Sequence, residues 1–145
     1  ERLELMNRSS FNFFEQNIRE ALSIEEIKEM KDYVDFQSHT LTHPILPYCD
    51  DKTSLIEVVN SKLLLQQILN KPIEGFAYPN GDYTEREIEF CKKAGYKYAL
   101  TIRPGFNTLR TSFYELKRIG TNDTDSMSEF AVRVSGFWSL LKRFA

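Results

Sequence analysis

The sequence predicts an α/β fold in which helices cover a mainly parallel sheet or barrel. Short strand-like runs alternate with helical patterns of about ten or more residues, which is typical of βαβ units. Four helix-start signals recur along the chain at regular places between these runs. A length of 145 residues corresponds to about one domain. With 41% hydrophobic residues the chain has enough apolar mass for one core, so we expect a single domain over residues 1–145.

Capping boxes predict where four helices begin. In each, a Ser or Thr side chain can accept a bond from the backbone amide three residues later, and a Glu at that later position bonds back. The four boxes begin at Ser23, Ser54, Thr84 and Ser126. Apolar residues at helical spacing follow each of them, the last stripe including Trp138.

Strand-like runs lie between these helices. They cover residues 33–37, 73–78, 96–102 and 115–119. The first segment, residues 3–22, carries apolar residues at helical spacing and is expected to form one or two helices with a break near residues 8–10.

Composition excludes several classes of function. The net charge of −2 argues against a nucleic-acid groove, which needs a basic excess. No apolar run approaches the roughly 18–20 residues of a membrane-spanning helix. The chain opens on Glu1 with neither an initiator methionine nor a signal peptide, so we expect it to be trimmed.

Cys49 and Cys91 match no zinc or thioredoxin spacing and are expected to be buried or half-buried thiols, with no support for a disulfide between them.

The two histidines of the chain, His39 and His43, stand four residues apart directly after a predicted strand. At this spacing both rings share one face of a helical turn and can hold one metal ion. Active sites of α/β folds gather at the C-terminal ends of strands. Ser38, Thr40 and Thr42 can orient the rings through hydrogen bonds. The alternative is a pair of surface or helix-capping histidines, because Zn²⁺ normally takes at least three protein ligands.

A second polar loop follows the predicted strand over residues 73–78. Its residues are Tyr78, Pro79, Asn80, Gly81, Asp82 and Tyr83. Pro-Asn-Gly is a turn signal, and Gly81 permits a positive φ. Rings beside polar groups suit a sugar site, although an ordinary strand-to-helix loop has the same composition. Arg103 lies on the same rim, where it could pair with an anionic sugar or an aspartate, or remain a solvated loop arginine.

Together these two motifs resemble the polysaccharide deacetylase family, the chitooligosaccharide deacetylase homology domain. The resemblance lies in Ser-His-Thr-x-x-His-Pro over residues 38–44, a long helix, and then Phe-Ala-Tyr-Pro-x-Gly over residues 76–81. The second form looks most like the branch that acts on biofilm and envelope polymers of N-acetylglucosamine. The resemblance runs from about Leu22 to the end of the chain, with weaker matches at residues 116–119 and 135–137.

The resemblance implies a partial or distorted (β/α) barrel of the polysaccharide deacetylase type. It implies that His39 and His43 are metal ligands, for Zn²⁺ above all, and that the groove for an N-acetylated glycan is lined by Tyr78, Pro79, Asn80, Gly81, Asp82 and Arg103. In the family a metal polarises the acetyl carbonyl and activates water, an aspartate acts as general base and a later histidine often acts as general acid. Only this resemblance suggests a cell-envelope or extracytoplasmic location.

The sequence departs from the family pattern in two places. Nothing between Glu1 and Asp35 matches the Thr-Phe-Asp-Asp motif that supplies the base and the third metal ligand, and there is no third histidine. The adjacent Asp50 and Asp51 come after the histidines and are expected to carry loop and helix-start charge. Asp82 is the better substitute carboxylate, because Asp35 should still lie within a strand. We therefore expect a domain that is incomplete at its N-terminus or degenerate, with a weakly held metal.

Two functions remain open at this stage. The first is metal-dependent hydrolysis of N-acetyl groups on an amino-sugar polysaccharide, incomplete or impaired in this chain alone. The second is a non-catalytic, deacetylase-like domain that binds glycans or other partners. An unrelated metal-binding α/β domain is a third reading of the same two histidines. The glycan and the oligomeric state are not indicated by the sequence.

Overall fold

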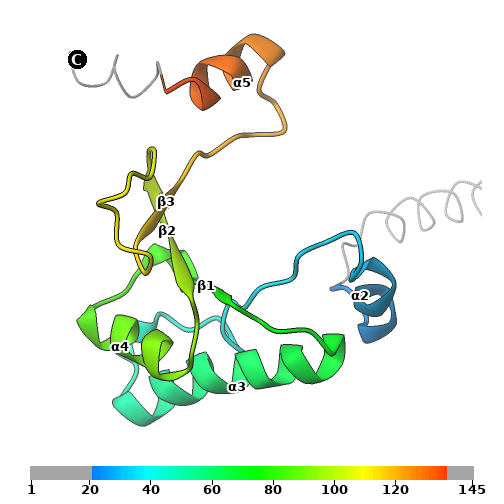
Figure 1. The fold of residues 1–145 in the computed structure, drawn as a ribbon, viewed down its shortest axis with the longest axis vertical. Coiled ribbons are helices and arrows are strands. Elements are labelled where there is room, and N and C mark those ends of the chain that lie inside the picture. The colour runs from blue at the N-terminus through cyan, green and yellow to red at the C-terminus, as the bar shows by residue number, and fades with distance from the viewer. Residues whose placement is uncertain (1–20, 137–145) are drawn as a thin grey trace, which may run out of the picture.

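The computed structural model describes residues 21–136. Its helices and strands are, in chain order, α2 (Ile24–Met30), η1 (Leu46–Tyr48), α3 (Asp51–Leu69), β1 (Gly75–Ala77), η2 (Pro79–Gly81), α4 (Glu85–Lys93), β2 (Tyr98–Pro104), β3 (Leu116–Arg118) and α5 (Met127–Val134), as Figure 1 shows. The helices expected within residues 3–22 lie almost entirely outside the described residues, as does Trp138. No helix within residues 21–136 is long and apolar enough to cross a membrane.

Three parallel strands form the sheet, in the order β1-β2-β3. Gly75 pairs with Tyr98 at the start of β1 and β2, and β2 pairs in turn with β3. A single parallel bridge joins Ser38 to Phe76 in β1. Helix α4 connects β1 to β2, so the predicted βαβ alternation is confirmed for this unit, whereas α3 connects only the bridge at Ser38 to β1. No helix separates β2 from β3, and the alternation is interrupted there (Figure 1).

The strand expected over residues 33–37 is not formed. Only Ser38 pairs with β1: its amide donates to the Gly75 carbonyl (3.1 Å) and its carbonyl accepts from the Ala77 amide (2.9 Å). One residue earlier, the Gln37 side-chain oxygen accepts from the amides of Glu74 (3.0 Å) and Gly75 (2.7 Å). A side chain therefore takes the place of backbone pairing, and the strand is reduced to one bridge.

The capping boxes at Ser23, Thr84 and Ser126 are confirmed. The one expected at Ser54 is wrong, because α3 begins a turn earlier. Asp50 is the N-cap, and its carboxylate accepts from the Thr53 amide (2.8 Å). Negative charge is therefore present at a helix start, as expected, with Asp50 as the N-cap and Asp51 in the first turn. Ser54 lies inside the helix, where its buried hydroxyl donates to Glu87 (3.2 Å).

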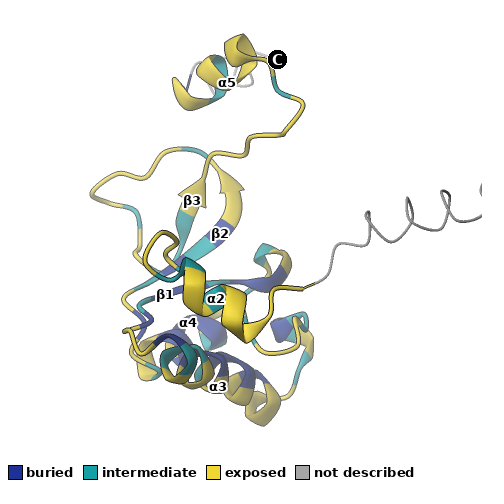
Figure 2. Ribbon diagram, turned by 90° about the vertical axis from the view of Figure 1, so that its right-hand side faces the viewer, coloured by how far each residue is buried: buried dark blue, intermediate teal, exposed yellow. Residues whose placement is uncertain are grey.

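The core lies where α3 and α4 pack against β1, and these elements carry most of the buried residues in Figure 2. Helices α2 and α5 are mainly exposed in the same view and bury no residue completely. Cys91 is buried in the core and Cys49 is half-buried, both as free thiols, as the sequence predicts. The buried apolar residues are Leu46, Val58, Leu69, Ile73, Phe76, Tyr78, Ile88, Phe90, Cys91, Tyr96 and Ala99.

Strand β3 is held by a side chain as well as by β2. Asn107, in the loop that follows β2, donates from Nδ2 to the Lys117 carbonyl (3.0 Å). Its Oδ1 accepts from the Lys117 amide (2.9 Å). Both backbone polar groups in the middle of β3 are therefore satisfied by one amide side chain.

Glu87 is fully buried at the junction of α3 and α4. Its carboxylate accepts from the Thr84 amide (2.8 Å) and hydroxyl (2.6 Å), and it forms an ion pair with Arg86 (2.7 Å). Burial would raise the pKa of Glu87, but the hydrogen bonds from Thr84 and Arg86 outweigh it and hold the pKa below its ordinary value. The fold therefore selects the charged form of this group.

We expect Glu87→Gln to lower the free energy of unfolding by about 2 kcal/mol, because hydrogen bonds to a charged group contribute about 1.5–3 kcal/mol. Since the folded-state pKa is lowered, this stabilisation is fully present above the ordinary value of 4.5. It is lost as the pH falls through the lower folded-state pKa. Urea denaturation of both proteins over a pH series measures the difference. A difference that stays constant from neutral to acidic pH would contradict the role of the carboxylate charge.

Candidate active site

The histidine segment lies at the C-terminal end of β1. Ser38 is paired to β1, and His39 follows it directly. The His39 Nδ1 lies 2.7 Å from the carbonyl oxygen of Ala77, the last residue of β1. Because a carbonyl oxygen only accepts, Nδ1 donates in this bond, which selects the tautomer whose lone pair lies on Nε2. The ring of His39 is therefore oriented with one nitrogen free to ligate.

The rings of His39 and His43 lie against each other, edge to face. Their centroids are 4.8 Å apart and their planes are inclined by 74°. Both residues are exposed. A ring whose second nitrogen donates to a carbonyl is the usual arrangement of a metal-binding histidine. The two donors therefore fit a divalent cation, while their role as ligands stays a prediction.

A third ligand is not found among residues 21–136, which contain no group of three His, Cys, Asp or Glu side chains placed to hold an ion. Asp82 is exposed and directly follows η2. Asp35 is also exposed, but its carboxylate accepts from Gln37 (2.7 Å) away from the histidines. The two histidines are thus the metal donors that the described residues offer.

The backbone between and at the histidines is unusual. Thr40 has φ 69° and His43 has φ 58°, the left-handed region that residues with a Cβ seldom occupy. The Thr40 hydroxyl accepts from the His43 amide (3.1 Å) and so spans the turn. Such conformations persist only where surrounding contacts impose them, and they gather at functional sites.

Glu57 on α3 supplies those contacts and was missed by the sequence interpretation, which assigned it to the capping box at Ser54. Its carboxylate accepts from the Leu41 amide (2.7 Å), the Thr42 amide (3.0 Å) and the Thr42 hydroxyl (2.6 Å). Glu57 is only 7% exposed. Burial would raise its pKa, but the hydrogen bonds from Thr42 and Leu41 keep the pKa below its ordinary value.

The Pro79–Gly81 turn follows β1 at the same end of the sheet as His39. Asn80 has φ 53° and Gly81 has φ 74°, so the expected positive φ of the glycine is confirmed. A Cβ on Gly81 would collide with the Ile102 side chain, which excludes larger residues on steric grounds as well. Within the turn, Pro79 is buried and Asn80 is exposed.

Tyr78 and Tyr83 stack on each other, with ring centroids 4.5 Å apart and planes inclined by 20°. Tyr78 is 1% exposed, and its hydroxyl donates to the Tyr114 carbonyl (3.1 Å). Burial raises the pKa of Tyr78 well above its ordinary value. The ring of Tyr78 therefore belongs to the core and presents no open face to a sugar, whereas Tyr83 is half-buried.

Arg103 is exposed and lies over the outer ring of this stack. Its guanidinium carbon is 5.3 Å from the centroid of Tyr83, a cation–π contact. One guanidinium nitrogen lies 3.6 Å from the Glu115 carboxylate, which also accepts from the Tyr83 hydroxyl (2.8 Å). The anionic partner within the chain is therefore Glu115. Arg103, Tyr83 and Glu115 form one polar cluster between the last residues of β2 and the start of β3.

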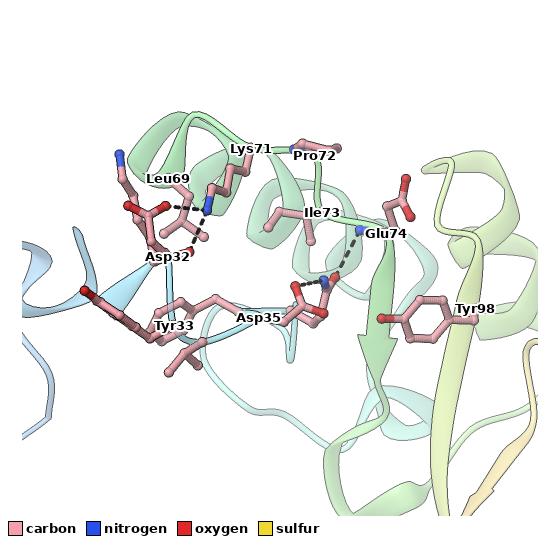
Figure 3. Close-up of a pocket in the computed structure, with 13 residues that line it drawn as sticks. Asp32, Tyr33, Asp35, Leu69, Lys71, Pro72, Ile73, Glu74 and Tyr98 are labelled. Carbon is pink, nitrogen blue, oxygen red and sulfur yellow. Dashed lines mark hydrogen bonds and ion pairs between the residues drawn. The ribbon is translucent and has the colours of Figure 1, made fainter. Parts of the chain in front are cut away.

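A cavity of about 550 Å³ lies at the opposite end of the strands, beside the first residues of β1 and β2 (Figure 3). Some of its polar side chains bind one another. Lys71 forms an ion pair with Asp32 (2.9 Å), and Gln37 donates to Asp35. We place the candidate site at the histidine end, where Nε2 of His39 is left free by the bond from Nδ1 to Ala77.

Comparison with known proteins identifies the family of the chain. The family profile described as polysaccharide deacetylase matches residues 8–99. The Bacillus subtilis protein YxkH, whose name places it among the polysaccharide deacetylases, is 27% identical over 114 residues, covering 78% of this chain and 41% of YxkH.

Two solved structures share the fold. The Streptococcus pyogenes deacetylase PplD, solved in complex with acetate, superposes with a TM-score of 0.73 at 27% identity and covers 81% of this chain and 52% of PplD. The Bacillus cereus polysaccharide deacetylase BC0361 gives a TM-score of 0.72 at 33% identity and covers 81% of this chain and 38% of BC0361. The chain thus spans about half or less of the length of these relatives, and the expected partial barrel of the deacetylase type is confirmed. Because the family profile covers well over half of its residues, the chain belongs to the polysaccharide deacetylase family.

Proposed function

We propose that this chain forms part of a metal-dependent enzyme that hydrolyses N-acetyl groups on an amino-sugar polysaccharide. The observation that carries the proposal is the pair of exposed rings at the end of β1, with Nε2 of His39 left free by the bond from Nδ1 to Ala77. Family membership supports the class of reaction. The related PplD was solved with acetate, the product that a deacetylase releases.

His39 and His43 would hold the cation. When bound, a divalent ion such as Zn²⁺ polarises a carbonyl oxygen and lowers the pKa of a bound water. A catalytic zinc site takes about three protein ligands and keeps one position open. With two donors among the described residues, we expect the chain alone to hold the metal weakly.

The wall of the groove is proposed to come from the loops at the same end of the sheet. Asn80 is exposed within the Pro79–Gly81 turn and can donate or accept hydrogen bonds with sugar hydroxyls, and the exposed Asp82 after it can accept them. Arg103, which lies over the Tyr83 ring, adds an exposed guanidinium that can donate hydrogen bonds to the glycan. Tyr78 supports this wall from within the core.

A non-catalytic glycan-binding domain is the alternative. The observation that favours it is that residues 21–136 contain no group of three His, Cys, Asp or Glu side chains placed to hold an ion, so no described carboxylate joins the two histidines as a third ligand. The two functions differ in whether an added carboxylate restores hydrolysis of N-acetyl groups.

Metal binding tests the histidine pair directly. We expect the chain to bind one Zn²⁺ or Co²⁺ weakly, and His39→Ala or His43→Ala to abolish the binding, because each variant leaves a single donor. Isothermal titration and the visible absorbance of Co²⁺ report the affinity. Asp82→Asn is the matched control: unchanged affinity means that Asp82 is no ligand, and unaltered binding in both histidine variants would refute the proposed centre.

Release of acetate from N-acetylglucosamine oligomers tests the chemistry. We expect very slow turnover by the chain with Zn²⁺, since a missing general base typically costs about 10²–10⁴-fold in rate. Added formate supplies an external carboxylate and should raise the rate of acetate release by at least about tenfold. The gain should vanish in His39→Ala. If formate has no effect while the oligomers still bind, the glycan-binding alternative holds. Robust turnover without formate that is lost in Asp82→Asn would identify Asp82 as the substitute base.

A further inference from the structure

Helix α3 contacts the histidine segment at two points one helical turn apart. Ser61 and Ser38 share a hydrogen bond of 2.6 Å, and both hydroxyls are buried. Four residues earlier on α3, Glu57 accepts three hydrogen bonds from Leu41 and Thr42. Residues four apart lie on one face of a helix, so a single face of α3 holds the segment before His39 and again between the two histidines.

The carboxylate of Glu57 is fully engaged in this contact. Its Oε2 accepts from the amides of Leu41 and Thr42, and its Oε1 accepts from the Thr42 hydroxyl. Oε2 therefore faces the backbone of the loop, and Oε1 faces the Thr42 hydroxyl. This geometry excludes Glu57 as a metal ligand or general base in this conformation and assigns it to the loop.

The loop needs an external constraint. Thr40 and His43 hold positive φ angles, which are unfavourable for residues with a Cβ. Leu41 and Thr42 lie between them, and they are the two residues whose amides Glu57 binds. Without these bonds the loop would lose the contacts that compensate the backbone strain.

We propose that Glu57 is a positioning residue, which through Leu41 and Thr42 fixes the loop conformation that brings the rings of His39 and His43 together. The consequence for metal binding rests on the proposed function. The conformational part does not, because it concerns the metal-free chain.

Glu87 provides a matched control for a merely structural role. It is also a buried glutamate that accepts from a Thr amide and hydroxyl, but its partners are Thr84, Arg86 and Ser54. None of these residues belongs to the histidine loop. Loss of Glu87 should therefore lower stability and leave the rings in place.

The experiment compares Glu57→Gln, Thr42→Val, Thr42→Ser and Glu87→Gln with the wild-type chain. In the metal-free proteins, NMR reports the amide protons of Leu41 and Thr42 and the nuclear Overhauser effect between the two histidine rings. We expect Glu57→Gln to shift and deprotect both amides and to remove the ring-to-ring effect. Thr42→Val should shift the two amides less and weaken the ring-to-ring effect. Thr42→Ser should keep the wild-type signals because it keeps the hydroxyl.

Zn²⁺ affinity, measured by titration, is the second readout. Loss of a partner that orients a metal ligand typically costs about 10–100-fold in affinity, and we expect this for Glu57→Gln. Glu87→Gln should unfold at a lower temperature with unchanged affinity.

The inference is overturned if Glu57→Gln keeps the amide signals and the ring-to-ring effect, or if Glu87→Gln loses them equally. A wild-type chain that binds no Zn²⁺ would overturn the proposed function instead. The NMR signals would then decide the role of Glu57 by themselves.

Discussion

Helix α3 buries hydroxyl and carboxylate groups on the face where a helix against a sheet ordinarily buries aliphatic side chains. Ser54, Glu57 and Ser61 lie on this face, together with the apolar Val58. Buried polar groups are costly unless they are paired, so each one dictates a partner. Ser54 requires Glu87 on α4, and Glu57 and Ser61 require the histidine segment. The fold and the candidate site are therefore both specified from one helix face.

Local signals were enough to predict much of the fold. Capping boxes and helical periodicity identified α2, α4 and α5, because both depend on neighbours within one turn. The start of α3 was misassigned because Ser54 and Glu57 have the spacing of a capping box while their partners are distant in sequence. Asp and Ser are about equally good N-cap residues, so no local pattern distinguishes Asp50 from Ser54. The missing strand before Ser38 has a similar origin, since it depends on which group meets the edge of β1.

The candidate site divides in the same way. The convergence of His39 and His43 follows from their spacing, and the turn at Gly81 follows from its residue type. The depth of Tyr78 could not be inferred, because an aromatic residue at a strand end suits both a core and a sugar surface. In the sequence Glu57 gives one weak signal, because it is a charged residue on the helix face that also carries Val58. Recognising its partners requires the folded chain.

The hydrogen bonds between Asn107 and Lys117 bear on self-association. A strand with unpaired backbone groups is a template on which another chain can add a strand. In β3 the amide and carbonyl of Lys117 are already taken by the Asn107 side chain, which mimics the pattern of a neighbouring strand. The strand is also short and carries Lys117 and Arg118, charges that oppose edge-to-edge stacking. One amide side chain thus leaves no free backbone amide or carbonyl at Lys117 to which a strand of another chain could add.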